Sequence, residues 1–196
     1  EPIPATIIAG GYHRDRYHGK RYSDVDIYVN DFPNEDVDLA DNVYDEDFWA
    51  DQFNLKIGSF LSMDMIRRLG PEDGGSGSAD GISAAFELYK NEIKYNILLV
   101  PDDPIKFIER DFDFNICKVY CDGHKVTFTK EFITDSENGT LTFSKSNPTS
   151  DYFEKSMTSH YPKLKEKYPE FQLMIPETCH KHLSKTKIPN ARLFKC

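Results

Sequence analysis

The stretch from residue 10 to residue 29, GGYHRDRYHGKRYSDVDIYV, constrains the fold of this 196-residue chain more than any other. Just before it, residues 5–9 form a short β-prone run that ends at two glycines. A polar segment follows and stops at Gly19, as a short helix stops at a glycine beyond its C-terminus. Residues 24–29 then alternate polar and apolar side chains, which is the period of a half-buried strand. The stretch predicts the order strand, glycine turn, short helix, strand.

Two carboxylates in this stretch are the strongest candidates for chemistry. Asp24 and Asp26 are two residues apart on an expected strand, so both project from one face of it. Carboxylate oxygens are the hard ligands that Mg²⁺ or Mn²⁺ prefers. A pair of such cations about 4 Å apart stabilises the attacking and leaving oxygens in phosphoryl transfer. Asp24 and Asp26 are therefore the predicted metal ligands and catalytic residues.

The glycines upstream are suited to binding phosphate. Gly10 and Gly11 have no Cβ, so the backbone can pass close to a phosphate group. The helix expected to follow offers free N–H groups to an anion, and Arg14 can add a bidentate contact. A glycine pair alone, or an aspartate pair alone, is a weak signal. Both together, in this order within 20 residues, form a much more specific pattern.

The stretch resembles the nucleotidyltransferase core of bacterial-type tRNA CCA-adding enzymes and bacterial poly(A) polymerases, within the DNA polymerase beta-type superfamily. Their pattern is GG-x-x-R-D-x-x-x-G, a short gap and D-x-D. In this chain its places are filled by Gly10, Gly11, Arg14, Asp15, Gly19, Asp24 and Asp26. Their second signature, R-D-F-T-I-N, is similar to RDFDFN at residues 110–115. In that family the second motif supports the sugar and phosphates of the nucleotide, so the resemblance implies Arg110, Asp111 and Asn115 as nucleotide-binding residues.

The resemblance covers roughly residues 5–120 and implies an α+β nucleotidyltransferase fold, with a mixed twisted β-sheet flanked by helices and a C-terminal helical extension. We expect a core over residues 1–149 and a basic helical extension packed on it over residues 150–196. Residues 74–78, GGSGS, look like a flexible linker, native or engineered, which need not mark a domain boundary.

Periodicity predicts further elements along the chain. Residues 84–90 and 93–100 are expected to be strands, and residues 126–132 and 139–143 a last hairpin. Helices are expected over residues 56–69, 105–110 and 151–168.

Two departures from the family pattern stand out. Asn96 lies where such folds often place a further carboxylate; its carbonyl can ligate a metal, but it brings no charge. The E-D-x-x-R helix that selects ATP and CTP in the CCA-adding family is missing, as is the long helical body that measures tRNA. Templated CCA synthesis is therefore not implied.

Basic residues gather in the last part of the chain. The net charge is -9, but residues 155–196 carry eight Lys and one Arg against three Glu, a net charge of +6 that leaves -15 for residues 1–154. Two interpretations stay open: a solvated surface, or a patch that binds a polyanion. In the second, Lys181, Lys185 and Lys187 are candidates for binding an RNA acceptor.

The predicted function is metal-dependent transfer of an NMP from an NTP to an acceptor, with Mg²⁺ or Mn²⁺ as cofactor. An RNA 3′ end, such as that of tRNA, is the favoured acceptor. Nucleotidylation of a protein or small molecule remains an alternative, as does a catalytically weakened nucleotide-binding regulator or inhibitor on the same fold. No apolar run is long enough to span a membrane, and residues 1–4 do not look like a signal peptide. Four cysteines without CxxC spacing fit a reducing, cytoplasmic setting. The sequence does not determine the oligomeric state.

Overall fold

The structure is a computed structural model that describes residues 6–30, 66–68, 81–82, 84–101, 103–183 and 191–195. These residues fall into two compact units. The first unit comprises the described residues up to Asp111, together with Tyr120–Val126. The second comprises Phe112–Val119 and the described residues from Thr127 onward. The linker-like residues 74–78 and most of the helix expected over residues 56–69 lie outside the described residues.

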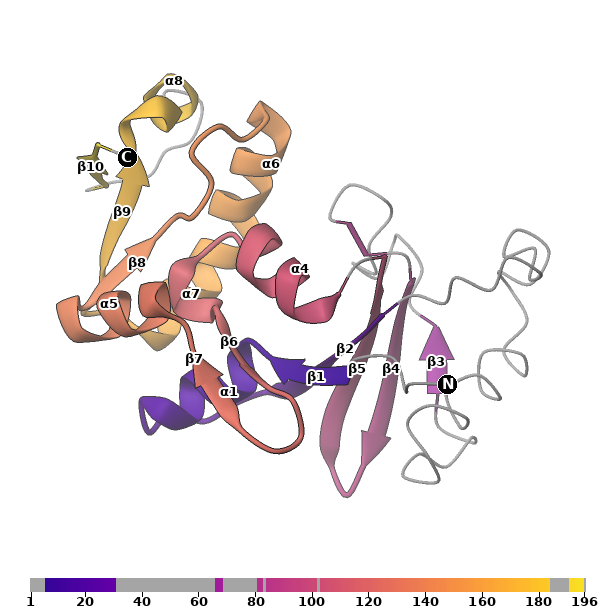
Figure 1. Cartoon of the computed structure of the whole chain (residues 1–196). Coiled ribbons are helices and arrows are strands. Elements are labelled where there is room, and N and C mark those ends of the chain that lie inside the picture. Colours follow the sequence, from indigo (N-terminus) through magenta and orange to yellow (C-terminus); the bar gives the residue numbers. More distant parts are fainter. Residues whose placement is uncertain are drawn as a thin grey trace. The chain divides into compact units, whose positions relative to one another are not determined.

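A mixed β-sheet of seven strands, in the order β3-β4-β5-β2-β1-β6-β7, organises the first part of the chain (Figure 1). Strand β2 is central: it runs antiparallel to β1 and parallel to β5. Strands β3 and β4 continue the sheet with antiparallel pairing. The strands are β1 (Thr6–Ala9), β2 (Asp24–Asn30), β3 (Ile66–Arg68), β4 (Ala84–Lys90), β5 (Ile93–Val100), β6 (Val119–Cys121) and β7 (Val126–Phe128).

One face of this sheet carries an apolar core. Side chains alternate along β2, so Val25, Ile27 and Val29 face the core while the residues between them face the opposite side. The core also contains Phe86 and Leu88 of β4 and Ile97 and Leu99 of β5. Burying each such side chain contributes about 1.5–3 kcal/mol, and a shift of one residue in register would expose the whole set. The core thus determines that Asp24 and Asp26 project from the other face.

Two helices of the first unit lie near the face of the sheet that carries Asp24 and Asp26. Helix α4 (Pro104–Asp111) buries Phe107, whose ring lies 5.9 Å from that of Tyr28 on β2. Tyr28 is therefore buried, whereas Asp24 and Asp26, nearer the start of the strand, stay partly exposed. Helix α1 (Gly11–Tyr17) is the predicted short helix, and Gly19 follows it with a positive φ of 64°.

The second unit contains a smaller, parallel sheet in the order β10-β9-β8. Its core is rich in aromatic residues and includes Phe114, Phe132, Phe143, Phe153 and Tyr168, all fully buried. The strands are β8 (Thr140–Thr142), β9 (Gln172–Pro176) and β10 (Arg192–Phe194). The helices are η4 (Asn115–Cys117), α5 (Lys130–Asn138), α6 (Ser150–Lys155), η5 (Ser156–His160), α7 (Tyr161–Lys167), η6 (Glu177–Cys179) and α8 (His180–Leu183).

The helix expected over residues 151–168 is confirmed as one continuous run of α6, η5 and α7. Thr149 caps its start by accepting a hydrogen bond from the N–H of Tyr152. Pro162 has no N–H, so it cannot donate an α-helical hydrogen bond to the preceding turn. The five-residue π-helix η5 lies directly before α7, the helix whose first turn contains Pro162. The C-terminal segment is thus helical as predicted, with β9 and β10 in addition. The boundary between residues 149 and 150 stays a prediction.

Two expectations for secondary structure are wrong. Ile66–Arg68 form a strand, not the end of a helix, because they pair with β4 at the sheet edge. The hairpin expected over residues 126–132 and 139–143 does not form. Val126–Phe128 and Thr140–Thr142 are strands, but they belong to different sheets, and Lys130–Asn138 between them form helix α5. The side chain of Thr129 accepts a hydrogen bond from the N–H of Phe132 at the start of this helix, and Gly139 ends it with a φ of 62°.

The α+β fold, with a mixed sheet and accompanying helices, is confirmed. In the part of the chain that the structure describes, no helix is long and apolar enough to cross a membrane.

Candidate metal and nucleotide site

The two aspartates lie at the middle of the seven-stranded sheet. Asp26 is opposite Ala9 of β1 on one side and opposite Asn96 of β5 on the other. Ala9 directly precedes Gly10, so the glycine turn begins beside the carboxylate. This arrangement confirms the predicted proximity of the glycine pair and the aspartate pair.

Asn96 links the two carboxylates. Its Nδ2 donates a hydrogen bond to Oδ1 of Asp26 at 2.7 Å and another to Oδ2 of Asp24 at 3.2 Å. All three side chains therefore share one face of the sheet, as predicted for the aspartates and for the position of Asn96. Oδ1 of Asn96 is buried and has no hydrogen-bond partner among the described residues.

The surroundings of Asp26 disfavour its charge. Burial is the largest cause and the carboxylate of Asp24 the next, and together they raise the pKa of Asp26 from 3.8 to about 6. The hydrogen bond from Asn96 and the positive charges of Arg14 and Lys94 act in the opposite direction but do not cancel the shift. A bound cation would favour the ionised form and lower this pKa, because its charge offsets the repulsion between the two carboxylates.

The donor set fits a hard divalent cation. Two carboxylates supply the oxygen ligands that Mg²⁺ and Mn²⁺ prefer, and the amide of Asn96, which turns its nitrogen toward them here, also carries an oxygen that has no hydrogen-bond partner among the described residues. No three His, Cys, Asp or Glu side chains of the described residues come together as a group able to hold a metal ion. A cation at the aspartate pair would therefore need further oxygen from Asn96, water or phosphate.

The glycine turn has a backbone that requires glycine. Gly10 has φ 72° and ψ -127°, a conformation that side chains with a Cβ rarely adopt. A Cβ on Gly11 would lie 3.4 Å from an Nη of Arg14, so the guanidinium lies against the turn.

Arg14 is held in place by its neighbour in sequence. Its Nε and one Nη both lie 2.7 Å from Oδ1 of Asp15, which is fully buried. Arg14 itself is 8% exposed. Asp15, which sequence reasoning included only as a place in the family pattern, therefore positions the arginine. The binding of phosphate by Gly10, Gly11 and Arg14 stays a prediction.

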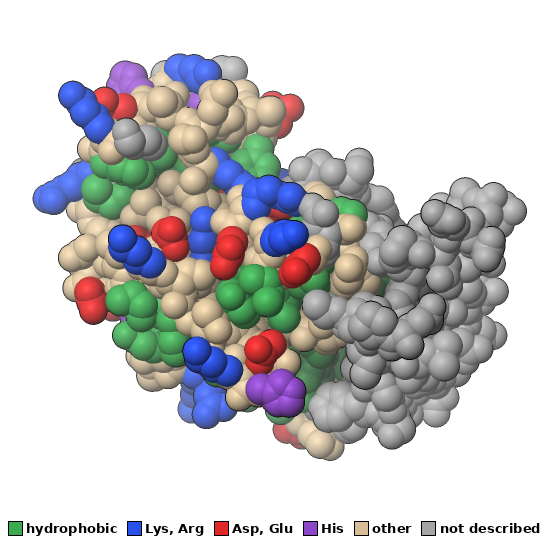
Figure 2. Space-filling view, viewed as in Figure 1, with side chains coloured by type: hydrophobic (Ala, Val, Ile, Leu, Met, Phe, Trp, Pro, Cys, Tyr) green, Lys and Arg blue, Asp and Glu red, His purple; other side chains and the backbone are tan. Residues whose placement is uncertain are grey.

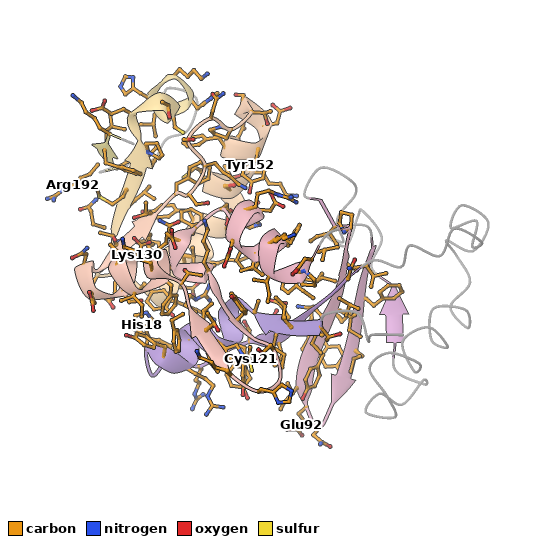
Figure 3. All side chains as sticks on the ribbon, viewed as in Figure 1. His18, Glu92, Cys121, Lys130, Tyr152 and Arg192 are labelled. Carbon is orange, nitrogen blue, oxygen red and sulfur yellow. The ribbon has the colours of Figure 1, made fainter. Side chains whose placement is uncertain are left out.

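The second signature is divided between the two units. Arg110 and Asp111, in the last turn of α4, form an ion pair with each other, at 2.7 Å between an Nη and Oδ2. The guanidinium is mostly exposed and the carboxylate less so. Asn115 opens η4 in the second unit, where it lines a groove of about 430 Å³ beside one face of α5 and the smaller sheet. Lys130 at the start of α5, which is labelled in Figure 3, also lines this groove. The role of all three motif residues in nucleotide binding stays a prediction.

Sequence reasoning missed one ion pair on the aspartate face. Lys94 of β5 is opposite Asp24 in register and forms an ion pair with Glu87 of β4, which is opposite Asn96. The alternation along β5 indicates only that Lys94 and Asn96, two residues apart, share a face; the pairing with Glu87 depends on the register with β4. The pair places one further positive and one further negative charge beside the aspartates.

The basic C-terminal residues are only partly described. Lys181 lies in α8, whereas Lys185 and Lys187 lie outside the described residues. On the face drawn in Figure 2, Lys and Arg side chains are interspersed with Asp and Glu. Lys165 has a structural role, since its Nζ donates to the carbonyls of Pro169 and Phe171.

Known structures share this fold. One is a Thermotoga maritima CCA-adding enzyme complexed with tRNA, with a TM-score of 0.56 and 16% identity over 92% of this chain and 37% of that one. A CCA-adding enzyme complexed with CTP has a TM-score of 0.56 and 16% identity, covering 92% and 38%. A tRNA-processing enzyme in an apo form has a TM-score of 0.52 and 16% identity, covering 92% and 41%.

The chain thus spans about two fifths of the length of the enzymes whose fold it shares. No protein-family model matches the sequence, and no curated protein matches it either. At this identity the likeness shows the fold alone, and the chemistry depends on the residues of the site.

Proposed function

We propose that this chain is a metal-dependent nucleotidyltransferase that moves an NMP from an NTP onto an acceptor, with an RNA 3′ end such as that of tRNA as the favoured acceptor. The observation that carries the proposal is the pairing of Asp24 and Asp26 on one face of the central strand, beside the turn at Gly10. The similarity of the fold to CCA-adding enzymes supports it.

Each part of the site has a role in this proposal. Asp24 and Asp26 hold the cation, with Asn96 between them. Mg²⁺ or Mn²⁺ supplies charge stabilisation for the attacking and leaving oxygens of phosphoryl transfer. The turn at Gly10 and Gly11 lets the backbone approach the phosphates of the NTP. Arg14, positioned by Asp15, binds the negative charge of the same phosphates. The sugar and phosphates of the nucleotide are also bound by the second motif, through Arg110, Asp111 and Asn115.

The acceptor is inferred from the neighbours and from the basic C-terminal segment. One neighbour is complexed with tRNA and others with CTP or ATP. Lys181, Lys185 and Lys187 are our candidates for the phosphates of the acceptor. Nucleotidylation of a protein or a small molecule would use the same aspartates with a different acceptor.

A second candidate is a nucleotide-binding regulator of low activity. The observation that favours it is Asn96, an uncharged side chain in hydrogen-bond contact with both aspartates where a carboxylate would add charge. The regulator and the enzyme differ in turnover, not in cation or NTP binding.

The test is transfer of label from NTP. The protein is incubated with each NTP labelled at the α-phosphate, with Mg²⁺ or Mn²⁺ and total RNA, and the products are separated. We expect α-label to enter RNA only when the cation is present, and γ-label to stay out of it. If the label entered protein instead, a protein and not RNA would be the acceptor. NTP binding without any transfer would favour the regulator.

A further inference from the structure

We propose that the side-chain amide of Asn96 turns over when a cation binds: its nitrogen holds the two aspartates together in the free protein, and its oxygen ligates the cation in the bound protein. Asn96 is then a neutral third member of the cation site. The inference rests on the proposed function only in that Asp24 and Asp26 bind a divalent cation.

The amide nitrogen of Asn96 lies between the two carboxylates. Nδ2 of Asn96 lies within hydrogen-bond distance of one oxygen of each carboxylate, at 2.7 Å and 3.2 Å. Two carboxylates this close repel one another unless something positive stands between them. The two N–H groups of the amide supply that positive end of a dipole. Asn96 therefore stabilises the paired carboxylates when no cation does.

The amide oxygen of Asn96 is in a different situation from the nitrogen. Oδ1 of Asn96 is buried without a hydrogen-bond partner among the described residues, while the nitrogen of the same amide makes two hydrogen bonds. A buried acceptor without a hydrogen-bond partner costs free energy. Binding of an ion is one reason why a protein keeps such a group. In the free protein the amide is thus satisfied only through its nitrogen, and its oxygen, the atom that a divalent cation prefers, has no hydrogen bond among the described residues that would hold it where it is.

The favoured orientation of the amide depends on whether a cation is bound. With no cation, an inward-facing Oδ1 would meet the oxygens of Asp24 and Asp26, and like partial charges would repel. With a divalent cation between the carboxylates, an inward-facing Nδ2 would be repelled and an inward-facing Oδ1 attracted.

The other charged groups near the site are paired with each other and cannot change orientation between the two aspartates as the Asn96 amide can. Glu87 is opposite Asn96 and is paired with Lys94, and Arg14 is paired with Asp15. Within the described ranges, the Asn96 amide is therefore the group that contacts both aspartates by hydrogen bonds and can reverse its polarity.

The test follows the Asn96 amide directly in the wild-type protein. The side-chain ¹⁵N–¹H₂ resonances of Asn96 are assigned by their loss in Asn96→Asp and followed during a titration with Mg²⁺, without NTP. We expect two downfield amide protons in the free protein, because both donate to carboxylates, and an upfield shift of both as Mg²⁺ saturates. Asp26→Asn is the control and should abolish the Mg²⁺ response. Downfield protons that do not move at saturating Mg²⁺ would overturn the inference.

A second measurement uses cation affinity, read as free Mn²⁺ by electron paramagnetic resonance. Asn96→Ala removes the ligating oxygen and should weaken Mn²⁺ binding at least about tenfold, because loss of even an outer-shell partner usually costs about 10–100-fold in metal affinity. Asn96→Asp adds a charged oxygen and should tighten it by at least about tenfold. Unchanged affinity in both folded variants would also overturn the inference, as would absence of Mn²⁺ binding by the wild type.

These outcomes are separable from the proposed function. Label transfer with an amide that does not respond to Mg²⁺ would remove the inference and keep the enzyme. An amide that responds in a protein that transfers no label would keep the inference and remove the enzyme.

Discussion

The affinity of the site for a divalent cation should depend on pH through Asp26. Burial and the neighbouring carboxylate of Asp24 raise the pKa of Asp26 to about 6. A cation binds the ionised carboxylate, so protonation competes with it. At pH 7 about 90% of such a carboxyl is ionised and at pH 5 about 10%, so the apparent affinity should fall about tenfold between these values.

In the cation-free protein the raised pKa of Asp26 makes the free energy of unfolding fall as pH rises, whereas cation affinity increases with pH. Because the folded pKa of Asp26 lies above its ordinary value of 3.8, the folded state binds more protons than the unfolded state between those two values. This contribution to the free energy of unfolding is present at low pH and is lost as pH rises through about 6; its upper limit is about 3 kcal/mol. Saturating Mg²⁺ should remove this dependence, since it holds Asp26 ionised.

The assay is Mn²⁺ binding between pH 5 and pH 7 at constant ionic strength, with Asp26→Asn as the control. The variant should bind weakly at all pH values and lose most of the pH dependence. Wild-type affinity that changes less than about twofold over this range would refute the assigned environment of Asp26.

Three further predictions concern the scaffold and the acceptor. Glu92, at the tip of the β4–β5 hairpin (Figure 3), has a φ of 64°, so Glu92→Gly should raise the free energy of unfolding by about 1 kcal/mol in urea titration; a loss of stability would contradict the turn geometry. Asp15 is a fully buried partner of Arg14, so Asp15→Asn should lower the free energy of unfolding by about 3–5 kcal/mol in the same titration, and a change below about 1 kcal/mol would show that the pair is dispensable. If the acceptor is RNA, replacing Lys181, Lys185 and Lys187 with Gln should flatten the slope of log affinity against log salt by about 2, using about 0.7 per single-strand phosphate contact. A salt-insensitive reaction, unchanged in that triple variant, would remove RNA as the acceptor.

The aspartate site could be predicted from sequence because its information is local. Asp24 and Asp26 alternate with Val25 and Ile27, and this period alone places both carboxylates on one face. The glycine turn is also a local signal, since few other residues adopt the backbone of Gly10. The place of Asn96 came from the resemblance, and the parallel pairing of β2 with β5 bears it out.

The pairing of Lys94 with Glu87 and the orphan oxygen of Asn96 could not be predicted. They depend on the register between strands that lie far apart in sequence, which no local pattern specifies. Helix α5 is a different case: Thr129 before it and Gly139 after it are standard cap residues, and the apolar run at its start was misinterpreted as a strand.

The most direct test of the account is the rate of Mg²⁺-dependent transfer of α-labelled NMP by the wild type and by the Asp24→Asn, Asp26→Asn double variant. The account predicts a loss of at least about 100-fold, because the variant lacks both charges that hold the cation where negative charge develops. The circular dichroism spectrum should be unchanged, since both side chains lie on the face opposite the apolar core. A folded double variant that transfers label at nearly the wild-type rate would contradict the assignment of these two aspartates as the catalytic centre.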